Sequence, residues 1–384
     1  MKRINGLYEK IISPDNLRKA DKKARRHKEG TRGVRLFDEN RERNFIVLHE
    51  ALLTKRYHTS EYRTFTIHEP KERLISCVPY YPDRIVHHAV MNVLEPIWLK
   101  TFTHNTFSCI KGRGIEGCAR AVDRIFRKYR GRPLYCLKID IRKFYPSIDH
   151  EVLKAIVRRK IKDNNLLWLL DELIDSTDGL PIGNHTSGFF ANLLLSYFMH
   201  WINEVMRCEV RPASLDAVEY MDDIPFFSDS KAVLHKVLEA VMKFMQKLHL
   251  TLKSNFQIFR IAESRYDKHG RALDFVGYNF FRKHKLLRKC IKKNLCRAVA
   301  RIRKRQPDIT YKDFKMAISA WIGWVKHSDS KNLLKIVTNN LNNDFYGKLR
   351  HEALEIRGSR QRKLHLPLEH SRSGSSYTRR RTAA

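Results

Sequence analysis

Three aspartates in this sequence occupy positions where their carboxylates could act together. Asp222 and Asp223 are adjacent in YMDDIPFF (220–227), among residues typical of β-strands, and Asp140 lies near the end of the apolar run PLYCLKIDI (133–141). If the strands that carry them are neighbours, the three carboxylates meet at one edge of a sheet. Clustered carboxylates repel one another unless a cation compensates them. Two divalent metal ions would do so, and would also stabilise the attacking and leaving oxygens of a phosphoryl displacement.

The composition indicates a polyanionic partner. Lysine and arginine total 75 against 41 aspartates and glutamates, which gives a net charge of +34. Nucleic acid is the commonest acidic partner of such a chain, and an anionic membrane surface is the other candidate. A run of about 18 apolar residues is absent, so we expect no spanning helix. The N-terminus lacks the apolar core of a signal peptide, and the seven cysteines contain no CxxC pair. We therefore expect reduced thiols, no zinc site and a cytoplasmic protein.

Hydrophobic periodicity predicts a chain of mixed helices and strands. The basic segment after about residue 285 is predicted to be helical, and 289–305 carries an apolar stripe. We expect helices over 82–102 (broken before Pro96), 150–174 (one or two), 179–206, 231–252 and 289–305. We expect strands over 62–76 (a hairpin), 133–141, 217–229 (two strands around a tight turn) and 273–281.

The order of these segments resembles the reverse transcriptases. YMDD between two strands resembles their catalytic motif, and LKIDIRKFYPSIDH (137–150) and GLPIGNHTSGFFANLLL (179–195) resemble two palm motifs. EPKERLISCVPYYPDRIVHHAV (69–90) resembles the finger segment, and LDFVGY (273–278) a late palm motif. The resemblance implies an α+β right-hand polymerase with fingers and palm around an antiparallel sheet, and an α-helical thumb. The implied parts are an N-terminal helical extension (1–60), fingers and palm (61–280), a basic thumb (281–350) and a basic, flexible tail (351–384).

Within that family the sequence resembles the reverse transcriptases of diversity-generating retroelements. Ile182 stands where many reverse transcriptases have Gln, although Gly188 stands where this group usually has Gln. HKLLRK (284–289) and SAWIGWVKHSDSKNLL (319–334) resemble the ends of these enzymes. The resemblance implies error-prone copying of a template-repeat RNA in a bacterial, archaeal or phage-encoded system. Its implied partners are dNTPs, template and primer RNA, the cDNA, and a small basic accessory protein that forms a pentamer.

Two other interpretations remain open. One is another prokaryotic reverse transcriptase, of the anti-phage defence or retron type. The other is a catalytically inactive polymerase fold that only binds nucleic acid.

The resemblance also implies a metal site. Asp140, Asp222 and Asp223, with the backbone carbonyl of Ile141, would hold two Mg²⁺ ions, for which Mn²⁺ could substitute. One ion would activate the primer 3′-OH and the other would neutralise the leaving pyrophosphate. Many relatives carry a lysine near position 256, a candidate general acid for pyrophosphate, where this sequence has Phe. Lys253 or water could act as the general acid instead.

Further residues are implied to contact the nucleotide and the primer. Tyr145 would lie under the sugar and exclude a 2′-OH, and Tyr220 and Met221 would pack near the primer terminus. Arg73 and Ile182 would set fidelity, because an Ile side chain cannot make polar contacts that depend on correct pairing. The implied nucleotide-binding residues are Lys71, Arg73, Tyr145, Ile182 and Gly183. A solvated hairpin tip is the alternative interpretation of Lys71 and Arg73, and core packing that of Ile182.

Three basic segments are candidates for RNA contact: 18–36, 289–305 and 357–384. The last is rich in Ser and Arg and is expected to be disordered when free. A solvated helix face is the alternative interpretation of the other two. The individual candidates are Lys22, Lys23, Arg25, Arg26, Lys292, Lys293, Arg297, Arg301, Arg303 and Lys304.

Overall fold

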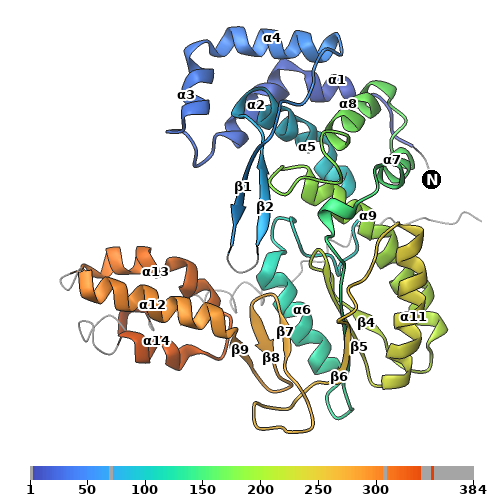
Figure 1. The fold of residues 1–384 in the computed structure, drawn as a ribbon, viewed down its shortest axis with the longest axis vertical. Coiled ribbons are helices and arrows are strands. Elements are labelled where there is room, and N and C mark those ends of the chain that lie inside the picture. The colour runs from blue at the N-terminus through green and yellow to red at the C-terminus, as the bar shows by residue number, and fades with distance from the viewer. Residues whose placement is uncertain (1–2, 69–71, 306–308, 339–346, 350–384) are drawn as a thin grey trace, which may run out of the picture. The chain divides into compact units, whose positions relative to one another are not determined.

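A computed structural model describes residues 3–68, 72–305, 309–338 and 347–349 of the chain (Figure 1). The chain divides into two compact units. The first comprises the residues up to Val276 together with Phe280–Lys283, and the second comprises Gly277–Asn279 and the residues from His284 onward. Lys71 and the predicted tail (351–384) lie outside the described residues.

The predicted α+β class is confirmed by a four-stranded antiparallel sheet in the first unit. Its order is β4-β5-β3-β6, and we call it the palm sheet. Successive side chains of a strand point to opposite faces. In β5, Phe226 lies against Phe198 on one face and Phe227 lies against Phe126 on the other, with ring centroids 6.3 and 5.9 Å apart. Helices therefore cover both faces, which explains the continuous apolar run of β5. The strands are β3 (Tyr135–Asp140), β4 (Asp216–Ala217), β5 (Asp223–Ser228) and β6 (Gln257–Arg260).

The helices around the palm sheet follow the predicted order. Helix α6 lies on the Phe227 face, whereas α9 and α11 lie on the Phe226 face. The predicted 150–174 segment forms two helices, and 179–206 forms a turn followed by a long helix. Their bounds are α6 (Gly114–Lys128), α7 (His150–Arg158), α8 (Asn164–Ile174), α9 (Ser187–Trp201), a π-helix (Ile202–Met206), α10 (Arg207–Glu209) and α11 (Lys231–Lys247).

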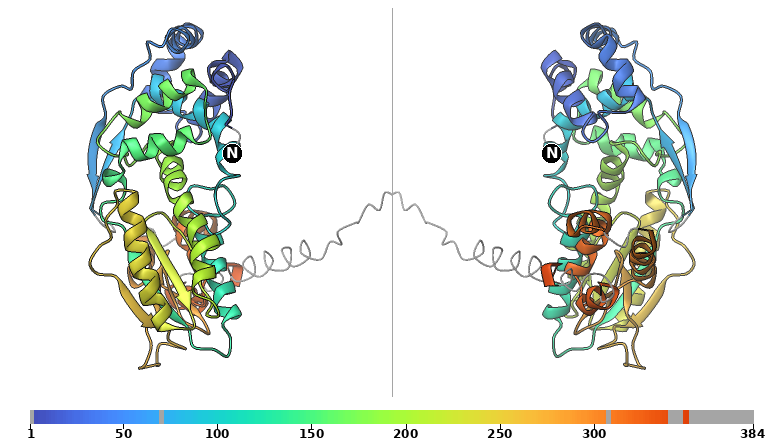
Figure 2. Two further views of the ribbon diagram at one scale, coloured as in Figure 1. Left: turned by 90° about the vertical axis from the view of Figure 1, so that its right-hand side faces the viewer. Right: turned by 90° about the vertical axis from the view of Figure 1, so that its left-hand side faces the viewer.

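The predicted hairpin is confirmed as β1 (Arg63–Ile67) paired antiparallel with β2 (Arg73–Cys77). It runs along one side of the first unit, from the N-terminal helices towards the palm sheet (Figure 1 and Figure 2). The N-terminal helices pack into the same hydrophobic core as the rest of the first unit. They are α1 (Tyr8–Ile12), α2 (Pro14–Ala24), α3 (Arg32–Glu39) and α4 (Arg41–Leu53).

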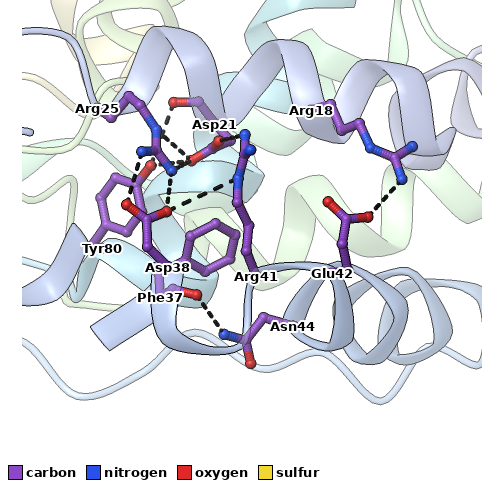
Figure 3. A network of polar contacts seen from close by, with 9 residues as sticks. All are labelled: Arg18, Asp21, Arg25, Phe37, Asp38, Arg41, Glu42, Asn44 and Tyr80. Atoms are coloured by element: carbon purple, nitrogen blue, oxygen red, sulfur yellow. Dashed lines mark hydrogen bonds and ion pairs between the residues drawn. The ribbon is translucent and has the colours of Figure 1, made fainter. Parts of the chain in front are cut away.

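A buried carboxylate joins three of these helices to the segment after β2 (Figure 3). Asp21 of α2 is fully buried and pairs with Arg25 at 2.9 Å and Arg41 at 2.7 Å. It also accepts a hydrogen bond from the Tyr80 hydroxyl, and Arg25 reaches Asp38 of α3 at 2.7 Å. A buried charge is tolerated when it is paired and hydrogen-bonded in this way. The network fixes α2, α3 and α4 to the segment that follows the β1–β2 hairpin.

Two element predictions were wrong. Helix α5 (Ile85–Trp98) continues through Pro96 instead of breaking before it. Proline removes one backbone donor, but the helix ends two residues later, and the complete burial of Leu94 and Trp98 on either side outweighs that loss. The segment 273–281, predicted as a single strand, forms two strands joined by a turn. The turn lies at Val276 and Gly277, which have φ values of 40° and 84°. The strands are β7 (Leu273–Phe275) and β8 (Tyr278–Phe280), and β9 (Lys285–Leu287) completes a three-stranded sheet.

The second unit is mainly helical. Helix α12 (Lys289–Arg305) buries Leu295 and Val299, as its apolar stripe predicted. Gly277 allows close packing here, because a Cβ atom at this position would lie 2.3 Å from the Trp324 ring. The other helices are α13 (Tyr311–Lys326) and α14 (Lys331–Thr338). Among the described residues of both units, no helix is long and apolar enough to span a membrane.

Candidate active site

The pairing of β3 with β5 brings the predicted aspartates together. Asp140 is the register partner of Asp223, and the backbone N–H of Ile141 donates to the Asp222 carbonyl at 3.3 Å. The turn Tyr220–Asp223 closes through two hydrogen bonds between its end residues, of 3.2 and 3.3 Å. Met221 adopts a φ of 57° in this turn. We call Asp140, Asp222 and Asp223 the aspartate site.

Two lysines compensate the charge of this site: Lys253, which the sequence analysis considered as a proton donor, and Lys138, which it did not consider. The Lys253 ammonium lies 2.7 Å from Asp140 Oδ1, and the Lys138 ammonium lies 3.3 Å from Asp223 Oδ2. Burial raises the pKa of Asp223 to about 6; Lys138 opposes this rise, and the charges of Asp222 and Asp140 add to it. The raised pKa shows that the lysines only partly offset the cost of placing these carboxylates together.

The aspartate site has the donors that a divalent cation requires. Asp223 Oδ1 is buried and has no hydrogen-bond partner within the described part of the chain. The carboxylates and the Ile141 carbonyl are oxygen ligands of the kind that Mg²⁺ prefers. In the described residues, no cluster of three or more acidic, His or Cys side chains is already arranged around a metal position. These residues therefore fit a divalent ion, which the three carboxylates and the Ile141 carbonyl would hold.

Tyr145 connects the Tyr220–Asp223 turn to the segment 179–183. Its hydroxyl donates to Met221 Sδ at 3.3 Å, and its carbonyl accepts from the Leu180 N–H at 2.9 Å. Burial raises the pKa of Tyr145, and the charges of Asp222 and Arg73 also act on its hydroxyl. The structure thus brings Tyr145 near both the aspartate site and the start of β2. Tyr220 is half-buried, and burial likewise raises its pKa.

Ile182 and Gly183 dock against the β1–β2 hairpin. The Ile182 carbonyl accepts from the Ser76 N–H of β2 at 2.8 Å. Gly183 has a φ of 135°, and a Cβ there would lie 2.3 Å from the Ser76 carbonyl oxygen, so the close approach requires glycine. Arg73, at the start of the same strand, is exposed, and Ile182 is half-buried. The two residues predicted to set fidelity therefore lie on two segments that are hydrogen-bonded together.

Gly188, the departure from the expected Gln, has a structural explanation. A Cβ atom at this position would lie 2.4 Å from Cys109 Sγ and 3.5 Å from Met221 Cε. The Cys109 side chain therefore occupies the space that a larger residue at 188 would need.

Besides Lys138, the sequence analysis missed a buried glutamate near the turn. Glu219 directly precedes Tyr220 and is fully buried. Burial raises its pKa to about 8, against a hydrogen bond from Thr106 and the charge of Arg113. Signals for the missed residues existed in the sequence: Lys138 alternates with Asp140 on β3, and a glutamate between apolar strand residues is itself unusual.

The basic candidates for RNA contact lie on two helical faces. Lys22, Lys23 and Arg26 are exposed, but Arg25 is held by Asp21 and Asp38. A hollow of about 370 Å³ on this face is lined by Arg18, Lys19, Lys22, Arg25 and Arg41. On α12, opposite the buried stripe, the exposed candidates are Lys292, Lys293, Arg297, Arg301, Arg303 and Lys304.

Comparison with known proteins identifies the family. Residues 67–280 match the family model described as reverse transcriptase (RNA-dependent DNA polymerase). The chain is 25% identical over 173 residues to protein YkfC of Escherichia coli, covering 41% of this chain and 45% of that protein. It is 24% identical over 100 residues to nuclear intron maturase 1, mitochondrial, of Arabidopsis thaliana, covering 26% and 14%. The chain thus spans less than half the length of these curated relatives.

Among solved structures, an apo telomerase from Candida tropicalis is similar, with a TM-score of 0.48 and 13% identity, covering 80% of this chain and 59% of that one. The family model matches more than half of the chain, and the chain belongs to the reverse transcriptase family. The family predicted from the motifs and the α+β right-hand fold class are therefore confirmed.

Proposed function

We propose that this chain is an RNA-directed DNA polymerase that copies a template-repeat RNA with errors at adenine, as part of a diversity-generating retroelement. The observation that carries the polymerase proposal is the register of β3 and β5, which sets Asp140 opposite Asp223 with Asp222 beside them. The charge of these carboxylates is only partly compensated by the lysines, which also supports the proposal. A bound divalent cation would compensate the remaining negative charge.

In this proposal the chain's own groups hold and orient the reactants. Asp140, Asp222, Asp223 and the Ile141 carbonyl bind two Mg²⁺ ions, or Mn²⁺ in their place. When bound, these ions lower the pKa of the primer 3′-OH and neutralise the leaving pyrophosphate. Lys253, whose ammonium lies 2.7 Å from Asp140 Oδ1, would be freed from this carboxylate if a metal ion took its place. It is the side chain that we propose would donate a proton to pyrophosphate.

The nucleotide is held from the fingers side. Lys71 and Arg73 bind the triphosphate, and Tyr145 packs under the sugar, where its ring excludes a 2′-OH. The hydrogen bond from Tyr145 to Met221 supports this placement, since it joins the sugar position to the primer-terminus residues Tyr220 and Met221.

The mutagenic part of the proposal rests on Ile182. Its backbone is committed to Ser76, so its position beside β2 is fixed while its side chain offers no hydrogen bond. A site without polar contacts to the nascent pair discriminates weakly between correct and incorrect bases. Arg73, on the docked strand, is the second residue that we propose sets fidelity.

The proposed partners follow from the same family resemblance. They are dNTPs, template and primer RNA, the cDNA and a small basic accessory protein that forms a pentamer, in the cytoplasm of a bacterium or archaeon or of a phage-infected host. The basic faces of α2 and α12 are the proposed RNA contacts, because clustered cations on one helix face bind phosphates through counterion release. The domain division 1–60, 61–280, 281–350 and 351–384 is retained as part of the proposal.

Sequencing of cDNA tests the proposal. The purified protein is given a primed RNA template, dNTPs and Mg²⁺, with and without a structured RNA partner, and errors are scored by template base. Errors concentrated opposite adenine are expected, and Ile182→Gln should reduce them. Asp223→Asn is the blank. If the wild type makes no metal-dependent product with the RNA partner present, the remaining interpretation is a catalytically inactive fold that binds nucleic acid.

A second candidate is favoured by Gly188. Because Cys109 fills the space that the usual Gln would need, the local packing departs from the retroelement pattern. Another prokaryotic reverse transcriptase, of the defence or retron type, accommodates that departure. Faithful cDNA from the same assay would support this candidate and eliminate the mutagenic role.

A further inference from the structure

Glu219 is a buried carboxyl group that the proposed roles leave unused. Its side chain is 0% exposed, and its Oε2 accepts a hydrogen bond from Thr106 Oγ1 at 2.8 Å. Its Oε1 is buried and has no hydrogen-bond partner within the described residues. An unpaired buried polar atom costs free energy, so its presence calls for an explanation.

The backbone of Glu219 joins the Tyr220–Asp223 turn to the loop Thr103–Arg113. Its N–H donates to the Asn105 carbonyl at 2.9 Å, and its carbonyl accepts from the Phe107 N–H at 3.1 Å. Arg113 stiffens the same loop, because its guanidinium donates to the Thr103 and Thr106 carbonyls at 2.6 and 2.8 Å. The Glu219–Thr106 side-chain bond is the third link between turn and loop.

The surroundings of Glu219 favour a neutral side chain. Arg113, at the start of α6, and the Cys118 thiol on α6 are the titratable groups that interact with it. The Arg113 guanidinium is committed to backbone carbonyls, and no cation lies within ion-pair distance of Glu219 in the part of the chain that is described. Desolvation therefore dominates and raises the pKa of Glu219 to about 8.

We propose that Glu219 is a positioning residue which, as a neutral carboxylic acid, holds the Tyr220–Asp223 turn against the Thr103–Arg113 loop through Thr106. The inference rests on the proposed polymerase function and names a residue that acts on the aspartate site through the backbone. When Glu219 loses its proton, the carboxylate is buried with one oxygen that lacks a donor. Hydration stabilises that charge only if the turn opens, and opening displaces Asp222 and Asp223.

The test compares the pH dependence of the wild type with that of Glu219→Gln, which keeps the shape of the neutral acid. Single-turnover incorporation is measured with saturating primer–template and Mg²⁺ from pH 6.5 to 9.5. The ratio of the Gln variant's rate to the wild-type rate should rise about eightfold between pH 7.5 and 9, since the protonated fraction of a group with pKa about 8 falls by that factor. The pH-dependent difference between the two proteins should appear in kcat, and the KM for dNTP should be the same in both. Glu219→Ala should be slow at every pH.

The matched control is Glu209→Gln, an exposed glutamate on α10, whose rate ratio should be flat. A flat ratio for Glu219→Gln, or wild-type rates for Glu219→Ala, would overturn the inference.

A second measurement separates this inference from the polymerase proposal. Without metal or substrate, the wild type should lose stability relative to Glu219→Gln as pH rises from about 4.5 to 8, because the folded pKa lies above the unfolded value. If the wild type makes no cDNA under any condition, the polymerase proposal fails. Equal pH dependence of melting in both proteins would refute the neutral, buried state of Glu219 whether or not the protein is active.

Discussion

Replacing Asp223 with Asn should make the metal-free protein more stable while abolishing polymerase activity. The pKa of Asp223 is raised from 3.8 to about 6 in the folded protein, and the side chain is 28% exposed. A difference of about 2 pH units corresponds to about 3 kcal/mol of stability. Because the folded pKa lies above the unfolded one, this stability is present below pH 3.8 and is lost as pH rises through 6. Asn carries no charge and avoids that loss.

The assay is urea unfolding in EDTA at several pH values from 4 to 8. The Asn variant should exceed the wild type by up to about 3 kcal/mol at pH 7.5, and the difference should vanish near pH 4. Lys138 keeps a partner in the variant, because its ammonium also donates to the Asp274 carbonyl at 2.6 Å. Added Mg²⁺ should stabilise only the wild type appreciably, since binding to the folded state raises its stability.

Asp216→Asn is the matched control in the same sheet. That carboxylate is held by the Lys128 ammonium at 2.6 Å and the Tyr129 hydroxyl at 3.0 Å, so its removal should lower stability at pH 7.5. The reasoning is refuted if Asp223→Asn is no more stable than the wild type at pH 7.5, or if both proteins show the same dependence on pH.

Three other outcomes are expected. Gly188→Ala should lower the free energy of unfolding in urea by about 1–3 kcal/mol through overpacking against Cys109, and Cys109→Ala in the same chain should restore most of it; no loss would contradict the packing argument. Arg73→Ala should raise the KM for dNTP about tenfold or more with little change in RNA affinity, because a charge-assisted hydrogen bond contributes about 1.5–3 kcal/mol. The double change Lys292→Glu and Lys293→Glu should weaken RNA binding regardless of sequence and flatten the plot of log K against log salt by about 1.4, whereas an unaltered slope would place RNA elsewhere.

The wrong helix and strand predictions have a common physical origin. Proline in 82–102 and a continuous apolar run in 273–281 are local signals, and local rules predict a break and a single strand from them. Burial of Leu94 and Trp98 keeps α5 intact through Pro96. Packing of Trp324 against Gly277 accompanies the turn that divides β7 from β8. Tertiary contacts between distant segments overrode both local preferences.

The sequence alone determined the family and the composition of the candidate site. Paired carboxylates next to strand residues, an upstream strand-end aspartate and the order of the motifs are all local patterns, and local patterns suffice when the chemistry demands particular residues. Only the tertiary structure decided what surrounds them. Lys253, Lys138 and Glu219 acquire their roles from neighbours far along the chain, because burial and charge pairing depend on distance in space, which sequence spacing does not encode.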